Sequence, residues 1–375
     1  MLRSKKVIAT LAISTMALAA CSQNDEVNTD NADVQTTMEE KIIIDQTGTE
    51  VTIKDKVDSI ATGGILPYFH TWYVATNSTK EIVAMHPNSY NAAENSMLAK
   101  LSPDILNAST DFVKNGETNI EELMNLNPDI YFELTTNEKT IEQTRAAGIT
   151  TVGIKAIDAA AAEPLATFNS WLQLTAEIAD TTERADRFLE EGTTVQNEIN
   201  EKIKDLTPEQ KPNALMLYQL SEQSITVSGK GFFGNQWLNA TGANDVAEKD
   251  VQGRKDVNME QILSWNPEII YLTNFTPVQP EDLYNNNIEG QDWSQVDAVK
   301  NKKVYKIPLG IYRWFPPSGD APLMLKWLAN HNQPELFNYD MNNEIRTYYK
   351  DFYNYDVTNE EIQSILNPSS EAAKY

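Results

Sequence analysis

Two segments of the chain combine aromatic residues with glycines in a way that suits the binding of a large, flat or cyclic molecule. The first spans residues 63–73 and the second spans residues 229–237. Aromatic rings supply broad contact area, and glycine lets the backbone approach a ligand closely. The side chains of these segments that we predict to bind a ligand are Tyr68, His70, Trp72, Tyr73, Phe232, Phe233 and Trp237.

Arginine adds a charge preference to this predicted site. Arg313 stands between Tyr312 and Trp314, and a guanidinium held among aromatic rings calls for an anionic partner such as a carboxylate or a catecholate. These three residues and Arg254 complete the predicted ligand site. Each aromatic residue in it is equally suited to a domain core, so the sequence leaves open which of them line the ligand.

The three histidines, His70, His86 and His331, are poorly spaced for a free metal ion. Sites for zinc or manganese collect several histidines and carboxylates, and the chain has neither a His-x-x-x-His nor a Cys-x-x-Cys spacing. We therefore predict no metal site and no resident cofactor. Haem iron needs only one protein axial ligand, which Tyr68, His70 or Tyr73 could supply.

A repeated pattern indicates how these residues are positioned. Residues 119–130 and 258–269 share one register, with Asn first, an acid third, apolar residues at helical spacing, and then Asn-Pro before a β-rich run. Each copy predicts a helix, a turn and a strand, because Asn is a common N-cap. Two copies predict two related α/β lobes with the ligand site in the cleft between them. Two unrelated units that look alike are the alternative.

Short β-rich runs alternate with helical stretches along most of the chain, which is typical of mostly parallel, helix-covered sheets. We predict a first lobe over residues 41–160, opening with a hairpin around Thr47 and Gly48, and a second lobe over residues 208–375. The predicted strands lie near residues 59–62, 81–84, 129–133, 150–154, 214–219, 225–228, 268–273 and 303–307.

Between the lobes, residues 161–207 predict one long amphipathic helix, because apolar residues recur about every 3.5 positions. Such a helix would reach about 60 Å and run along both lobes, with Gly192 as the expected point of a bend. A coiled-coil dimer is the rival explanation, which we disfavour because regular leucines are missing and Pro212 introduces a new α/β run. The apolar stripe consists of Trp171, Ile178, Ala185, Phe188, Val195, Ile199 and Ile203.

The start of the chain predicts export. Residues 1–20 have a basic beginning and an apolar stretch too short to span a bilayer, which is typical of a signal peptide. The following Leu-Ala-Ala-Cys resembles the bacterial lipoprotein cleavage box, which makes Cys21 the expected site of lipidation, with residues 21–40 as a disordered tether. The lipid would be the only membrane attachment, on the outer face of the membrane or in the periplasm. A secreted protein with a free thiol at Cys21 is the alternative.

Charge and motifs narrow the function. A formal net charge of −24 opposes binding to nucleic acid. The sequence has no Gly-x-Ser-x-Gly elbow, P-loop or nucleotide fingerprint, and its only cysteine is assigned to lipidation, so an enzyme is not expected. The 54 acidic residues nevertheless leave a secreted surface hydrolase, such as a glycosidase, as the alternative from another class.

Two lobes joined by one helix, the repeated Asn-x-Glu and Asn-Pro elements and the lipoprotein box resemble class III substrate-binding proteins of ABC importers, which carry siderophores, haem and cobalamin. The C-terminal course, including residues 304–308 and 334–337, is also similar, so the resemblance covers about residues 41–366. It implies Rossmann-like lobes, a carrier without enzymatic activity, and an ABC permease with its ATPase as partners. It also implies that Glu121 and Glu260 dock on basic residues of the permease, although first-turn acids equally suit the helix dipole.

We therefore predict a monomeric, lipid-anchored binding protein that captures an iron complex, a siderophore or haem, and presents it to the permease. A corrinoid is the alternative ligand, because no residue pattern separates these ligand classes.

Overall fold

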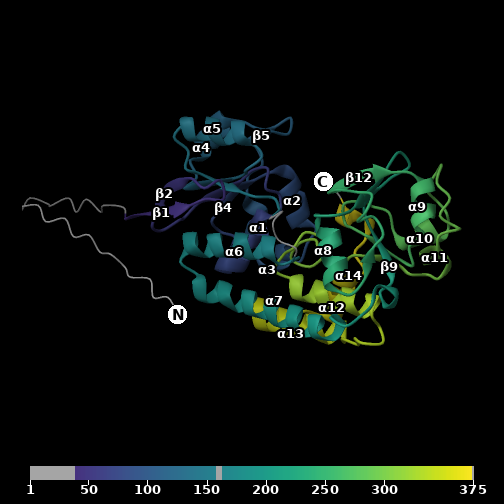
Figure 1. The fold of residues 1–375 in the computed structure, drawn as a ribbon. Coiled ribbons are helices and arrows are strands. Elements are labelled where there is room, and N and C mark those ends of the chain that lie inside the picture. The colour runs from purple at the N-terminus through teal and green to yellow at the C-terminus, as the bar shows by residue number, and fades with distance from the viewer. Residues whose placement is uncertain (1–38, 158–162, 374–375) are drawn as a thin grey trace, which may run out of the picture. The chain divides into compact units, whose positions relative to one another are not determined.

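The computed structural model describes residues 39–157 and 163–373, which form two α/β lobes connected by helices (Figure 1). The predicted signal peptide at residues 1–20, the lipidation site Cys21 and the tether up to residue 38 lie outside the described residues. Within the described ranges, no helix has both the length and the hydrophobicity needed to cross a bilayer.

The first lobe is built on a four-stranded parallel sheet with the strand order β4-β3-β7-β8. Its strands are β3 (Ile60–Thr62), β4 (Ile82–Met85), β7 (Ile130–Leu134) and β8 (Thr151–Ile154), each at a predicted position. The predicted hairpin is also present, as the antiparallel pair β1 (Glu40–Ile44) and β2 (Glu50–Lys54). The helices of this lobe include α1 (Tyr68–Thr76), α2 (Pro87–Glu94), α3 (Leu98–Leu101) and α5 (Glu138–Ala146).

The second lobe has a mixed sheet in which β9, β13 and β14 are parallel and β10 and β12 extend one edge in antiparallel pairing. Four of these five strands were predicted. The strand that was not predicted is β12, whose first residue is Arg254. The strands are β9 (Asn213–Leu220), β10 (Ile225–Ser228), β12 (Arg254–Val257), β13 (Ile269–Leu272) and β14 (Val304–Lys306). The helices include α8 (Phe233–Ala240), α10 (Pro280–Tyr284), α11 (Asp297–Lys300), α12 (Ala321–Asn332), α13 (Met341–Tyr353) and α14 (Asn359–Leu366).

The repeated pattern forms two matching helices, α4 (Ile120–Leu126) in the first lobe and α9 (Met259–Trp265) in the second. The side chains of Asn119 and Asn258 accept hydrogen bonds from the backbone N–H groups three residues later, at 3.1 and 2.9 Å. Asn127 and Asn266 end the helices in the left-handed conformation, with φ of 45° and 39°. Asn tolerates this conformation better than most residues, which explains it at the end of each helix, whereas side-chain capping explains it at the start.

The prediction of one helix over residues 161–207 was wrong. Two helices are present, α6 (Ala166–Ala179) and α7 (Thr182–Ile203), and Asp180 between them has φ of 55°. The break therefore falls at Asp180, whereas Gly192 lies inside α7 and is buried. A regular repeat of apolar residues continues through the break, which is why the sequence pattern does not reveal it.

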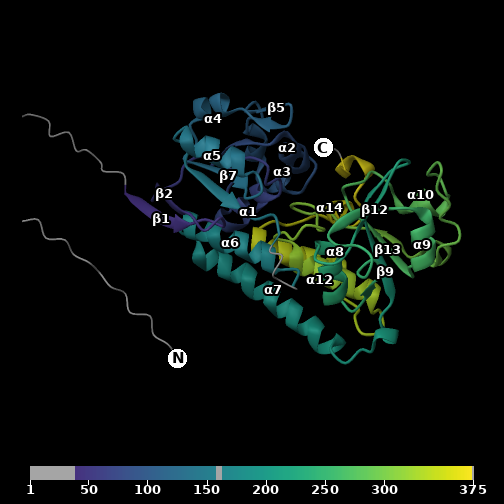
Figure 2. The same cartoon turned by 45° about the horizontal axis from the view of Figure 1, so that its top comes forward.

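The apolar stripe itself is buried along both helices, as predicted. Helix α6 packs on α1, while α7 contacts α1 of the first lobe and both α8 and α12 of the second. The stripe is thus covered within one chain, which accounts for it without a coiled-coil dimer. Figure 2 shows α7 passing from one lobe to the other, in the role predicted for a stiff connector.

Candidate functional site

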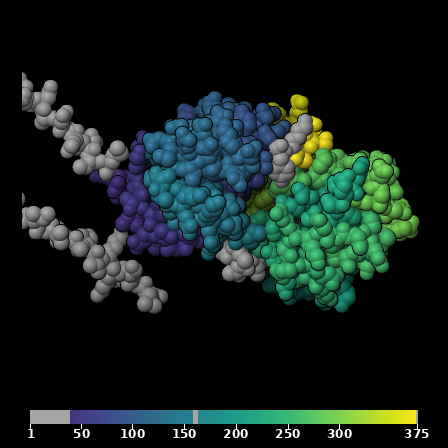
Figure 3. Space-filling view, turned by 90° about the horizontal axis from the view of Figure 1, so that it is seen from above, coloured from purple at the N-terminus to yellow at the C-terminus, as the bar shows by residue number. Residues whose placement is uncertain are grey.

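A cleft separates the first lobe from the second when the described residues are viewed in space-filling form (Figure 3). One side-chain contact between the lobes joins α1 to the loop after β14. His70 stacks on Tyr312, with 5.0 Å between ring centroids and 26° between ring planes, and it faces Phe168 of α6 on its other side at 5.9 Å. The structure thus brings together two predicted site residues from opposite lobes.

The surroundings of His70 are apolar. Its side chain is fully buried, and neither ring nitrogen has a hydrogen-bond partner among the described residues. Burial lowers the pKa of His70 to about 3, so its imidazole is neutral at physiological pH. A neutral ring with one N–H and one lone pair can donate to an acceptor or bind a metal centre.

Arg313 is buried beside this contact. Only 1% of the residue is exposed, and its guanidinium carbon lies 4.6 Å from the ring centre of Phe275 and 6.0 Å from that of Tyr312. One guanidinium nitrogen donates to the carbonyl of Ala372 at 3.3 Å. The guanidinium therefore lies against aromatic rings, close to the contact between the lobes.

An aromatic cluster in the second lobe surrounds this cation. Tyr218, at the end of β9, lies between Phe232, Phe275 and Phe315 with centroid distances of 4.8 to 5.7 Å. Arg254 donates to the Tyr218 hydroxyl at 2.8 Å, with its guanidinium carbon 5.0 Å from the ring centre. Burial raises the pKa of Tyr218, against the opposing effect of the two arginines, so the phenol stays protonated.

Lys306 adds a third positive group to this part of the lobe. Its amine donates to the carbonyls of Thr273, Thr276 and Val278 at 2.6 to 3.0 Å, which fixes the loop after β13. Burial lowers the pKa of Lys306 to about 7, and the nearby Arg313 lowers it further. The Lys306 amine is thus occupied by backbone carbonyls, whereas Arg254 and Arg313 both lie close enough to Tyr218 to act on its hydroxyl.

Asp320 holds the loop that carries Tyr312 and Arg313. Its carboxylate accepts from the backbone N–H of Ile311 at 2.9 Å, the indole of Trp314 at 3.0 Å and the hydroxyl of Tyr353 at 2.8 Å. Burial raises the pKa of Asp320 to about 6 in spite of these donors. The same network makes Trp314 a positioning element of the loop.

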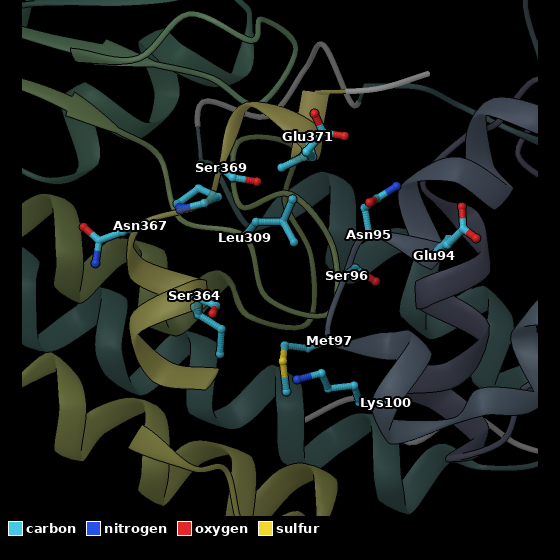
Figure 4. A pocket seen from close by; sticks show the side chains of 13 residues that line it. Glu94, Asn95, Ser96, Met97, Lys100, Leu309, Ser364, Asn367, Ser369 and Glu371 are labelled. Atoms are coloured by element: carbon cyan, nitrogen blue, oxygen red, sulfur yellow. The ribbon is translucent and has the colours of Figure 1, made fainter. Parts of the chain in front are cut away.

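A cavity of about 350 Å³ opens beside Arg313, between α2 and α3 of the first lobe and α14 of the second (Figure 4). Leu309 and Ala372 form part of the cavity wall. Leu309 pairs with the backbone of Arg313 in an isolated antiparallel β-bridge, and the carbonyl of Ala372 accepts the hydrogen bond from the Arg313 guanidinium. Two contacts connect the lobes at this end, a hydrogen bond from Met97 N to Gly310 O at 2.9 Å and a Lys100–Glu361 ion pair at 3.0 Å.

Two buried polar side chains lie at the carboxyl ends of parallel strands, one in each lobe. Thr62 ends β3 and Asn274 follows β13, and each has a side-chain oxygen without a partner among the described residues. Buried polar atoms are nearly always satisfied. The carboxyl ends of strands are also where open α/β sheets bind their ligands, so these oxygens mark the edge of a binding region.

Other predicted site residues lie in lobe cores. Tyr68 packs on Phe132 at 4.4 Å and bonds to Thr175 at 2.7 Å. Trp72 is 1% exposed and Trp237 is fully buried. The indole of Trp237 donates to the carbonyl of Phe315 at 2.7 Å. These surroundings favour a supporting role.

The remaining predicted aromatic residues lie between the lobe cores and the candidate site. They are Tyr73, Phe232 and Phe233. The ring of Tyr73 lies 5.9 Å from Tyr353 of the second lobe, at the lobe junction. Phe232 is partly exposed beside Tyr218, whereas Phe233 is buried behind it, 5.3 Å from Phe232. Phe232 is thus the better placed of the two to meet a ligand.

Sequence reasoning missed Tyr218, Phe275 and Lys306. Tyr218 and Lys306 belong to strands that were predicted, and each lies close to the carboxyl end of its strand. Their position could have identified them as candidate ligand contacts, because open α/β sheets bind ligands at the carboxyl ends of their strands. Phe275 follows β13 in a loop, where no pattern distinguishes a ligand contact from a core contact.

The two predicted docking residues, Glu121 and Glu260, are exposed at the same position of α4 and α9. Neither forms an ion pair with another described residue. In the described ranges no group of three or more His, Cys, Asp or Glu side chains is arranged to hold a metal ion.

Comparisons with known proteins agree on one family. A profile described as periplasmic binding protein matches residues 66–309. The molybdate-binding protein MolA of Haemophilus influenzae is 24% identical over 335 residues, which cover 84% of this chain and 91% of that protein.

Solved structures extend the similarity to nearly the whole fold. A periplasmic solute-binding protein from Veillonella parvula has 32% identity and a TM-score of 0.79, covering 89% of this chain and 98% of that one. Helicobacter pylori CeuE, solved with a nickel–histidine complex, has 25% identity and a TM-score of 0.65, covering 88% and 99%. These relatives bind solutes, and the alternative of a secreted hydrolase finds no support among them. The chain belongs to the periplasmic binding protein family, as a class III substrate-binding protein of ABC importers and not an enzyme.

Proposed function

We propose that this protein captures an anionic iron complex, a siderophore or haem, in the cleft between its lobes and delivers it to an ABC permease. The observation that carries the proposal is Arg313, 1% exposed and stacked on Phe275 next to the contact between the lobes. A guanidinium pairs well with planar anionic groups such as carboxylates and catecholates. Aromatic rings beside it suit the planar groups of a catecholate or a porphyrin.

His70 and Tyr312 strengthen the iron-complex proposal. They come from opposite lobes, and the unbonded nitrogens of His70 suit an axial or hydrogen-bonding contact. A ligand held there would contact both lobes, which couples its binding to their relative tilt. Stiff connection through α7 limits that tilt to a small movement.

An oxyanion is the second candidate ligand. The relative MolA is named as a molybdate-binding protein, and two arginines near Tyr218, Arg254 and Arg313, suit a compact anion as well as a large one. The many aromatic rings around Arg313 favour the larger complex, because an oxyanion needs donors and gains little from rings.

Docking on the permease would use Glu121 and Glu260. Both are exposed, and they occupy one position of the repeated motif in two lobes. Exposed carboxylates without an ion-pair partner among the described residues can meet basic residues of a partner, which fixes orientation and speeds association. Cys21 would carry the lipid that keeps the protein at the membrane, and loss of labelling by a palmitate analogue in Cys21→Ser would test this.

Tryptophan fluorescence titration tests the ligand proposal. The panel is a ferric catecholate siderophore, haem, molybdate and cobalamin, each added to the mature protein with the Arg313→Met variant measured in parallel. The proposal expects saturable quenching by a ferric siderophore or haem that the variant loses. Binding of molybdate alone would select the oxyanion, cobalamin alone would select the corrinoid, and no binding would refute the proposed cleft ligands.

A further inference from the structure

Two exposed apolar residues occupy the same position in the two copies of the repeated motif. Met124 in α4 is 50% exposed and Leu263 in α9 is 41% exposed. In the part of the chain that the structure describes, only five large apolar residues are at least 38% exposed, and the other three are Ile42, Ile44 and Leu336. Two of five falling on one position of two short helices calls for a common cause.

Both helices hold these residues outward in the same way. Each has seven residues, a capping Asn at its start and a left-handed Asn at its end. The residue just before the exposed one, Leu123 or Ile262, is fully buried and anchors the helix to its sheet. Burial of that position turns the next side chain away from the lobe core, so Met124 and Leu263 have equivalent orientations.

Each exposed apolar residue also lies one helical turn after an exposed acid. Met124 follows Glu121 by three residues, and Leu263 follows Glu260 by three. Residues three apart on a helix are neighbours on its surface. Each lobe therefore displays an acid and an apolar side chain as one compact pair (α4 and α9 in Figure 1).

We propose that Met124 and Leu263 are paired apolar anchors for the permease, and this inference rests on the proposed docking through Glu121 and Glu260. The partner surface would present two equivalent sites, each with a basic residue beside an apolar pocket, as a two-fold or pseudo-two-fold dimer does. The carboxylates set orientation and association rate, while the desolvated apolar contacts slow dissociation.

Charge complementarity supports this partner over a second copy of the chain. The protein has a formal net charge of −24, and each apolar residue sits beside an acid. Two copies meeting through these helices would bring acids together, which is unfavourable. A basic surface with apolar recesses fits both features of each pair.

Biolayer interferometry against the ABC permease–ATPase complex in nanodiscs tests the anchors. The variants are Met124→Gln, Leu263→Gln and their combination, with Leu336→Gln as a control that changes an equally exposed apolar residue elsewhere. The anchors predict about fivefold weaker binding for each single variant and at least about 20-fold for the double variant, mainly through faster dissociation. Leu336→Gln and the conservative exchange Met124→Leu should bind like the wild type.

The double variant Glu121→Gln with Glu260→Gln, measured in the same assay, distinguishes docking through the acids from anchoring through the apolar residues. If this acid variant binds weakly while the double Gln variant at Met124 and Leu263 stays within twofold of wild type, the anchors are refuted and acid docking stands. If the acid variant also binds like wild type, the docking proposal itself is wrong. Circular dichroism melting and unchanged ligand affinity confirm that each variant is folded.

Discussion

The imidazole of His70 in the first lobe stacks on the phenol ring of Tyr312 in the second, with 5.0 Å between centroids. Tyr312 is followed directly by Arg313, so this contact places a buried cation next to the meeting point of the lobes. Ligand binding and lobe contact are therefore expected to depend on the same few side chains.

Replacing His70 with Phe separates packing from ligand contact. The new ring keeps the stack on Tyr312 but removes two buried nitrogens that lack partners among the described residues. We expect the free energy of unfolding to stay equal or rise by about 1 kcal/mol, while ligand affinity falls at least about tenfold because a polar contact is lost. Urea unfolding and calorimetric titration measure the two quantities. Unchanged affinity would mean that His70 serves packing alone.

Arg313→Met should weaken binding of an anionic ligand by about 100-fold or more, which corresponds to about 2.7 kcal/mol. Thermal stability should fall modestly, because the buried carbonyl of Ala372 loses its guanidinium donor. Arg313→Lys should recover only part of the affinity, since an amine lacks the planar fork.

The matched control for Arg313 is Arg346→Met, an exposed arginine of α13 that bonds to Asn359. Its ligand affinity should equal that of the wild type. An equal loss in both variants would point to general electrostatics, and no loss in Arg313→Met would contradict the proposed site.

Lys306 gives stability a specific pH dependence. Its folded-state pKa of about 7 lies below the ordinary 10.5, so between these values the unfolded chain binds more protons than the folded one. Stability therefore rises with pH across this window, by at most about 1.4 kcal/mol per unit. Lys306→Met lacks this contribution, so the stability advantage of the wild type over the variant should grow from pH 7 to pH 9.

Urea unfolding at several pH values measures this difference. Lys303→Met, at an exposed position nearby, serves as the control and should follow the wild-type profile. A difference between wild type and Lys306→Met that stays constant from pH 7 to pH 9 would show that Lys306 remains charged in the folded protein.

The N-caps of α4 and α9 should contribute equally to the free energy of unfolding. Asn119→Ala and Asn258→Ala each remove one side-chain acceptor for a backbone N–H, which should lower the free energy of unfolding by about 1 kcal/mol. Asn125→Ala, at an exposed position inside α4, is the control and should change little. A marked difference between the two cap variants would argue against equivalent roles in the two lobes.

The repeated motif made the two-lobe fold predictable, because capping and helical spacing are local properties. Strands β3, β4, β7 and β8 were likewise visible as short β-rich runs. The break at Asp180 was not predictable from the apolar period, since burial continues in phase on both sides of it. β12 escaped because its residues are mostly exposed and polar.

The candidate site was predictable only in part. Arg313 and Tyr312 stood out because a charged residue among aromatic residues needs a reason for its burial. Tyr218 and Phe275 reach the same place through tertiary packing, which sequence spacing does not encode. Trp72 and Trp237 look equivalent to Phe232 in sequence, yet they are buried in their lobes while Phe232 remains partly exposed.

Hydrogen–deuterium exchange with a bound ferric siderophore or haem tests the central claim, that the ligand is held between the two lobes. Exchange would be compared for the free and the saturated protein across the whole chain. We predict that protection appears together in residues 63–70 of the first lobe and residues 310–315 of the second, and leaves α4 and α9 unchanged. Protection confined to one lobe would contradict the account.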